Sequence, residues 1–123
     1  METNYLDENL YTSLIQNDNV EKLLNEIALE GEKLKFQIAL YGNLKEEYIV
    51  TVFLDNEVVN AFGETAYAKV SMTGEQQLYL LDAELESSSI KDFSNLYAIA
   101  VPIQNPEKNE IKKTETVSVR IFK

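Results

Sequence analysis

Three carboxylates alternate along one stretch of the chain, and their spacing makes them the first candidates for chemistry. Asp82, Glu84 and Glu86 stand two residues apart, so in a regular strand they point to the same face. Clustered carboxylate oxygens suit Ca²⁺, and a pair of carboxyl groups, one protonated and one ionised, serves a glycosidase. With 21 acidic residues among 123, a solvated acidic face is the simpler interpretation. We therefore predict an interaction surface here and no metal or catalytic site.

Several reaction classes lack the side chains they require. The chain has no His, Cys or Trp, which removes imidazole chemistry, thiol nucleophiles, disulfides and the usual zinc ligand sets. The four glycines are isolated from one another, so no phosphate-binding loop is predicted. We expect no enzyme activity and no cofactor. A carboxylate-dependent glycan hydrolase is kept as a remote alternative.

Tyrosines are the other side chains that invite a binding function. The chain has seven, and an aromatic platform for carbohydrate would draw on Tyr41, Tyr67, Tyr79 and Tyr97. Strand tyrosines more often serve as amphipathic core or rim residues whose hydroxyl reaches water or backbone. No platform is therefore assigned from the sequence.

The net charge of −10 limits the class of partner. Phosphate backbones and anionic membrane surfaces are repelled at long range, so we expect neither nucleic acid nor anionic lipid to bind. The charge is uneven, because residues 1–30 contain seven acidic residues and one lysine. These features predict another protein as the partner. The acidic surface expected to meet it comprises Glu21, Glu26, Glu30, Asp82, Glu84 and Glu86.

The acidic N-terminal part of the chain has the apolar spacing of helices. One stripe, typical of an amphipathic helix, consists of Val20, Leu23, Leu24, Ile27 and Ala28, and a weaker one of Leu6, Leu10, Tyr11, Leu14 and Ile15. Asp18 is placed to cap the second helix at its start, and Gly31 to end it. We predict that residues 1–31 form an N-terminal helical arm and that residues 32–123 form a separate domain.

Beyond Gly31 the apolar period changes from 3.6 to 2, which is typical of strands. Seven strands are predicted, at residues 33–40, 48–54, 58–62, 65–72, 77–85, 96–103 and 116–122. They lie too close together for crossover helices, which predicts a mainly β, antiparallel, seven-stranded immunoglobulin-like sandwich. The side chains expected to face inward are Phe36, Ile38, Leu40, Val50, Val52, Ile99, Val101, Val117, Val119 and Ile121.

One region resembles a known class of domain. The stretch LKFQIALYGNLKEEYIVTVFLDNEVVNAF, followed later by FSNLYAIAVPI and TVSVRIF, is similar to small immunoglobulin-like sandwich domains of Gram-positive bacterial surface proteins and lipoproteins. The hairpin pattern of those domains is matched by Tyr48, Val50, Phe53, Leu54 and Asp55. The resemblance covers residues 33–122 and implies an extracellular accessory domain without catalytic residues. It also implies an anchor at the cell surface, through a leader and a lipidated cysteine outside the printed sequence.

Two functions follow as expectations. The first is a non-enzymatic binding or scaffolding module of a bacterial surface-associated protein. The alternative is a cytoplasmic acidic module that interacts with or inhibits another protein. The sequence leaves open the identity of the partner, the oligomeric state and the strand order.

Overall fold

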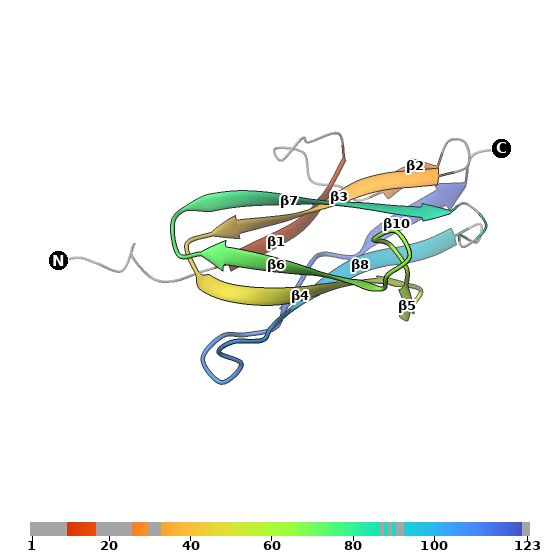
Figure 1. Cartoon of the computed structure of the whole chain (residues 1–123). Coiled ribbons are helices and arrows are strands. Elements are labelled where there is room, and N and C mark those ends of the chain that lie inside the picture. Colours follow the sequence, from red (N-terminus) through yellow and green to blue (C-terminus); the bar gives the residue numbers. More distant parts are fainter. Residues whose placement is uncertain are drawn as a thin grey trace.

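Ten β-strands arranged in two sheets make up the described part of the protein (Figure 1). The computed structural model describes residues 10–16, 26–29, 33–86, 88, 90 and 93–121. The strands are β1 (Leu10–Ile15), β2 (Glu26–Leu29), β3 (Lys33–Gly42), β4 (Lys45–Leu54), β5 (Glu57–Val59), β6 (Tyr67–Thr73), β7 (Gln77–Glu86), β8 (Phe93–Pro102), β9 (Lys112–Lys113) and β10 (Val117–Ile121). No α-helix occurs in these ranges. The described residues therefore include no helix that could cross a membrane.

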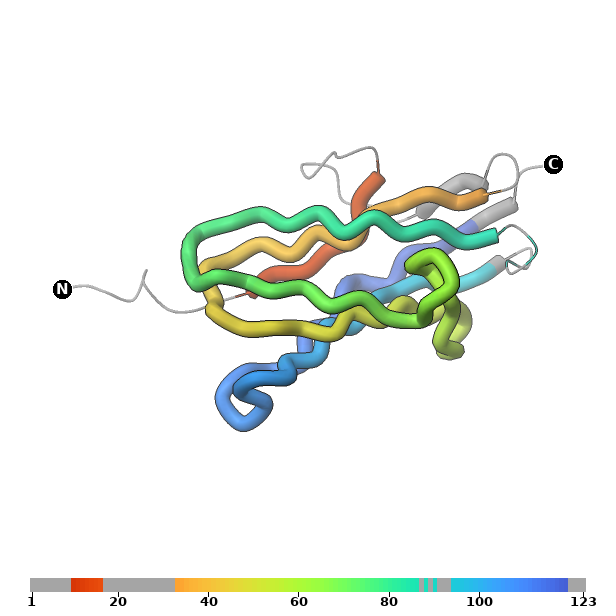
Figure 2. The backbone as a smooth tube through the Cα atoms, viewed as in Figure 1, coloured from red at the N-terminus to blue at the C-terminus, as the bar shows by residue number. Residues whose placement is uncertain are grey.

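The two sheets differ in size. The small sheet has the order β1-β3-β7, and the large sheet has the order β2-β10-β8-β4-β5, with β6 also pairing with β4 and β9 with β8. The chain passes between the sheets from β3 to β4 and again from β6 to β7, and both crossings lie at the same end of the molecule (Figure 2). All pairs are antiparallel except β2 with β10, which is parallel. The antiparallel pairing predicted for the sandwich domain is therefore confirmed for residues 33–121, whereas the described part of this range contains eight strands, β3 to β10, instead of the predicted seven.

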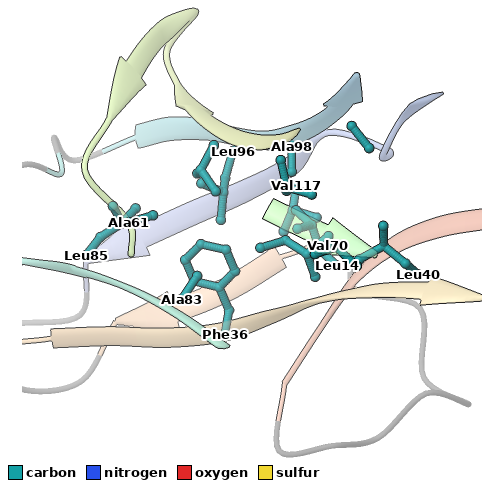
Figure 3. Packing of buried hydrophobic residues seen from close by; sticks show 14 of the residues in the cluster. Leu14, Phe36, Leu40, Ala61, Val70, Ala83, Leu85, Leu96, Ala98 and Val117 are labelled. Carbon is teal, nitrogen blue, oxygen red and sulfur yellow. The ribbon is translucent and has the colours of Figure 1, made fainter. Parts of the chain in front are cut away.

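The core lies between the sheets and follows the period-two pattern of β3 and β4. Phe36 on β3 and Val50 on β4 are almost fully buried, as their alternation predicts. Figure 3 shows Phe36 pointing from the small sheet toward Leu96 of the large sheet. The predicted inward positions that are confirmed as buried are Phe36, Ile38, Leu40, Val50, Val52, Val117 and Val119.

The predicted inward face of β8 is wrong. Ala98 and Ala100 are buried, whereas Val101 is 36% exposed and Ile99 is only partly buried. Both sets of alternating residues in this strand are apolar, so alternation alone does not distinguish its faces. The register with β4 puts Ala100 opposite Val50, so small β8 side chains lie beside larger inward ones on β4. Ile121, also predicted to face inward, has a side chain outside the described residues.

The described residues of the predicted helical arm form two strands and a bend at Gln16, with no helix. Residues 10–15 form β1, which pairs with β3, and residues 26–29 form β2, which pairs with β10. An i, i+4 pair such as Leu10 and Leu14 lies on one face of a strand as well as of a helix, so the spacing does not separate the two. Hydrogen bonding to a sheet edge then decides the conformation. Val20, Leu23 and Leu24 lie outside the described residues.

A tight turn joins β4 to β5 and fixes the position of β8. Asp55 and Asn56 have positive φ angles of 52° and 68°, the conformation of a type I′ hairpin turn. The Asp55 N–H donates to the Asn95 carbonyl oxygen, and the Asn95 N–H donates to Asp55 Oδ1, both at 2.9 Å. The turn thereby holds the end of β4 against the start of β8.

Candidate functional site

Large apolar side chains gather on the outer face of the large sheet. The β-sheet register places Phe53 between Val58 of β5 and Tyr97 of β8. The next row puts Tyr67 of β6 and Ile99 of β8 on either side of the β4 strand. We call this surface the outer β4–β8 face. It consists of Ile49, Phe53, Val58, Tyr67, Tyr97, Ile99 and Val101.

Two stacked aromatic rings form the centre of the outer β4–β8 face. The Phe53 and Tyr97 ring centroids are 5.1 Å apart, and the ring planes differ by 6°. Lys113 Nζ lies 4.5 Å from the centroid of the Tyr97 ring, in cation–π geometry. The Tyr97 hydroxyl donates to Asn56 Oδ1 at 3.2 Å, which ties the ring to the β4–β5 turn. These contacts hold the aromatic pair in one orientation before any partner arrives.

The outer β4–β8 face is accessible to solvent. Tyr67 is 59% exposed, Val58 52% and Val101 36%. An ion pair of 2.8 Å between Lys69 Nζ and Glu47 Oε2 lies beside it. Thr51 lies between Tyr67 and Ile99 in the middle of the face, and the remaining apolar side chains are partly buried. Exposed apolar side chains with polar groups among and around them are typical of protein interaction sites.

The predicted acidic residues on β7 lie on the outer face of the small sheet, where basic and polar groups accompany them. Asp82, Glu84 and Glu86 lie opposite Gln37, Lys35 and Lys33 of β3, in that order. Gln37 Nε2 donates to Asp82 Oδ1 at 3.0 Å, and Lys33 Nζ lies 3.2 Å from Glu84 Oε1. Within the described ranges, no group of three or more acidic residues is placed to hold a metal ion.

The other predicted site residues are not brought together by the described structure. Glu21 and Glu30 lie outside the described residues, and so does the side chain of Glu26. The candidate tyrosines are also dispersed. Tyr67 and Tyr97 belong to the outer β4–β8 face, Tyr41 lies opposite Tyr11 on the small sheet, and Tyr79 pairs with Leu40.

A buried carboxylate that the sequence analysis missed holds the loop after β8. Glu46 is fully buried on the inner side of β4. Its Oε1 accepts the N–H groups of Glu47 at 2.8 Å and of Gln104 at 2.9 Å. Its Oε2 accepts the N–H of Asn105 at 2.9 Å and Nδ2 of Asn109 at 2.7 Å. Extending the β4 alternation backwards from Tyr48 would have placed Glu46 on the inner face.

The hydrogen bonds decide the protonation state of Glu46. Burial by itself raises the pKa of a carboxyl group. The donors from Asn109, Gln104, Glu47 and Asn105 outweigh burial, so the pKa of Glu46 is lowered from its ordinary value of 4.5. Glu46 is therefore ionised at neutral pH and acts as a structural anchor for residues 104–109.

Tyr48 is the inward neighbour of Glu46 along β4, and its environment is the opposite. Its side chain is fully buried, and its hydroxyl has no hydrogen-bond partner in the described part of the chain. Burial, with a smaller contribution from the negative charge of Glu46, raises the pKa of Tyr48 to about 12. Tyr48 stays neutral at physiological pH and is a packing residue.

A cleft of about 670 Å³ opens beside β7. Its walls come from β3, β7, residues 61–63 and Ala68 of β6. The lining includes inward residues such as Phe36 and Ala83 together with the outward residues Asp82 and Glu84. The cleft therefore follows the edge of the small sheet.

Comparison with known proteins gives a fold but no family. No protein-family model matches the chain, and no curated protein matches it by sequence. Among solved structures, it is similar to a chain of the complex formed between Zinc 2-glycoprotein (ZAG) and Prolactin inducible protein (PIP) from human seminal plasma. The TM-score is 0.53 with 13% identity, and the alignment covers 86% of this chain and 100% of that chain. This similarity supports an immunoglobulin-like β fold.

Proposed function

We propose that the protein is a non-enzymatic binding module that engages another protein through the outer β4–β8 face. The observation that carries this proposal is the stacked Phe53–Tyr97 pair, surrounded by exposed apolar side chains on neighbouring strands. Val58 and Tyr67 are each more than half exposed and add little to the stability of the isolated domain. Burying such side chains against a partner removes apolar surface from water, which stabilises the complex.

The geometry of the face favours a protein partner with a complementary apolar patch. Its side chains stand on paired strands, and Tyr97 is held by Asn56 and Lys113, so little side-chain entropy is lost on binding. Tyrosine is also enriched among residues that dominate interface energetics. The structural neighbour was solved as a complex of two proteins, which agrees with a binding role.

The cellular location belongs to the same proposal. The resemblance to domains of Gram-positive surface proteins favours an extracellular module anchored at the cell surface, and a cytoplasmic interaction module is the alternative. Treatment of intact source cells with a protease, followed by immunodetection of the protein, separates the two locations. Loss of the signal from intact cells supports the surface location, and full protection supports the cytoplasmic one.

Photo-crosslinking in the source cells tests the binding face directly. A photoreactive phenylalanine analogue replaces Tyr67, and in a matched control it replaces Tyr41, which is 46% exposed on the small sheet. The proposal predicts one dominant crosslinked protein from position 67 that is not captured from position 41. Capture of that same protein at equal yield from both positions, or no adduct from position 67, would overturn the proposal.

A second substitution, combined with the photoreactive label at position 67, tests the face further. Val101→Lys places a charge in the apolar surface and is expected to abolish the crosslink from position 67. Tyr11→Lys is the control, because Tyr11 is 64% exposed and lies on the small sheet, opposite Tyr41. Crosslinking that survives Val101→Lys would contradict the assignment of the face.

A further inference from the structure

The second edge of β7 has no strand partner in the described part of the chain. β7 pairs with β3 along one edge, over residues 77–86, and is the last strand of the small sheet. Constant-type immunoglobulin sandwiches have a fourth strand beside the strand in this position. Here the segment before β6 supplies a single bond in its place, from the Glu84 N–H to the Ala61 carbonyl oxygen at 2.9 Å.

The bond to Ala61 shows which main-chain groups face the open edge. In an antiparallel pair, alternate residues direct their N–H and C=O groups toward the partner strand and away from it. Because Glu84 directs its N–H away from β3, Asp82, Leu80 and Leu78 do the same along the continuous register. They present a ladder of donors and acceptors at intervals of about 7 Å, which is the spacing that another strand recognises.

The edge lacks most of the features that usually prevent strand addition. Natural edge strands are often protected by charged side chains, especially lysine, or by proline, bulges or short length. The charges on β7 are the carboxylates of Asp82, Glu84 and Glu86, which disfavour an acidic strand and favour a cationic one. The ten-residue sequence of β7, QLYLLDAELE, has no Lys or Pro, and its register with β3 is unbroken. At the edge of the large sheet, by contrast, the pairing is divided between the short β5 and the lysine-bearing β6.

The cleft beside this edge has room for alternate side chains of an added strand. Its inner part is lined by the small residues Ala61, Ala68 and Ala83. Gly63 also borders it, and a Cβ built on Gly63 meets no atom within 4 Å. The outer part carries the carboxylates of Asp82 and Glu84 next to Lys35 and Gln37 of β3, and the chain has a net charge of −10. An inserted strand would thus place apolar side chains inward and cationic side chains outward.

We infer that the β7 edge binds an extended peptide segment of a partner protein, with alternating apolar and cationic residues, by strand addition. The segment pairs with the N–H and C=O groups of Leu80 and Asp82 and places an apolar side chain beside Ala68 and Ala83. This site lies on the opposite sheet from the outer β4–β8 face. It is a second binding site, and Val101→Lys should leave it intact.

A displayed library of random peptides of about 12 residues is the probe, selected against the whole chain. We expect the enriched peptides to alternate apolar residues with Lys or Arg residues.

Two variants test whether these peptides bind at the β7 edge. Leu80→Pro removes an edge N–H while leaving the β3 pairing, and should weaken the binding of these peptides by at least about tenfold. Leu80→Ala keeps the N–H and is the matched control. Ala68→Phe fills the cleft without altering the β7 backbone and should also weaken peptide binding. It therefore tests the site if Leu80→Pro does not fold.

Amide hydrogen exchange adds a readout on the edge itself. The Leu80 and Asp82 amides should exchange quickly in the free protein, and a selected peptide should slow them. The inference is overturned if no peptide is enriched, or if enriched peptides bind Leu80→Pro and Ala68→Phe as tightly as the original chain. It is also overturned if the two amides are already slow without peptide, because the edge is then covered by this chain or by a second copy.

Discussion

Along β4, Glu46 and Tyr48 point into the protein, whereas Ile49 and Phe53 lie on the outer face. The same contrast continues on β8, where Ala98 is buried and the larger Ile99 lies outward. The inner face of the large sheet thus includes a carboxylate, a phenol and alanines beside its valines and leucines, and the outer face includes large apolar groups beside polar ones. Side-chain chemistry alone does not identify the interior of this sandwich. An apolar group that folding leaves on the outside is available for binding.

The largest difference in stability is expected between an inward and an outward residue of β8. Leu96 is fully buried, so Leu96→Ala should lower the free energy of unfolding by about 2 to 5 kcal/mol. Ile99→Ala removes a partly buried side chain and should lower it by about 1 kcal/mol or less. Urea unfolding of both variants measures the difference. Equal losses would show that the two faces of β8 are wrongly assigned.

The buried charge of Glu46 is expected to stabilise the fold. Glu46→Gln replaces an acceptor of four hydrogen bonds with a neutral amide and should cost about 2 to 3 kcal/mol at pH 7. Glu47→Gln is the control, because Glu47 pairs with Lys69 at the surface and should cost less than about 1 kcal/mol.

The cost of Glu46→Gln should depend on pH in one direction. The pKa of Glu46 is lower in the folded protein than the ordinary 4.5, so the ionised group stabilises the fold above pH 4.5. That contribution is lost as the pH falls below 4.5 and through the lowered pKa. Unfolding measured from pH 7 downward should therefore show the two proteins converging in acid. A constant difference would mean that the charge of Glu46 is not what holds residues 104–109.

Tyr48 is expected to behave in the opposite way from Glu46. Its hydroxyl is buried without a partner among the described residues, so Tyr48→Phe should be neutral or stabilising by about 1 kcal/mol at pH 7. The pKa of Tyr48 is raised to about 12 in the folded protein, from 10 in the unfolded chain. The wild-type protein therefore loses stability as the pH rises from 10 to 12, by about 2 to 3 kcal/mol in full.

Alkaline unfolding of the Tyr48→Phe variant measures this contribution. The other tyrosines and the lysines titrate in both proteins, so only the difference between them reports on Tyr48. The variant should gain stability relative to the wild type across this pH range. A variant less stable than the wild type at pH 7 would show that the Tyr48 hydroxyl does have a partner.

The sequence predicts the inner and outer faces only where one face is clearly polar. Alternation in β3 correctly placed Phe36 and Ile38 in the core, because Lys35 and Gln37 separate them. In β8 both faces are apolar, so the assignment depends on pairing with β4, a contact distant in sequence. The predicted helix failed at residues 10–15 for a similar reason, since their partner strand decides the conformation.

The candidate site was harder to predict than the fold. The stack of Phe53 on Tyr97 depends on the register between β4 and β8, two strands far apart in sequence. Nothing in the local pattern of either aromatic residue reveals that contact. Glu46 was accessible to sequence reasoning in principle, because it continues the inward series of β4. Its four donors come mainly from a loop whose position no local rule provides.

The smallest effect is expected on the outer face of the small sheet, where the acidic side chains were predicted to interact. The side chains of Lys33 and Glu84 are 46% and 42% exposed, and their ion pair spans 3.2 Å. Water screens such a pair, and holding two long side chains costs entropy, so Glu84→Gln should change the free energy of unfolding by less than about 0.5 kcal/mol. Raising the salt concentration should bring the two proteins together. A loss comparable to that of Glu46→Gln would mean that Glu84 is as essential to the fold as the buried carboxylate, and the contrast between inner and outer positions would then fail for charged groups.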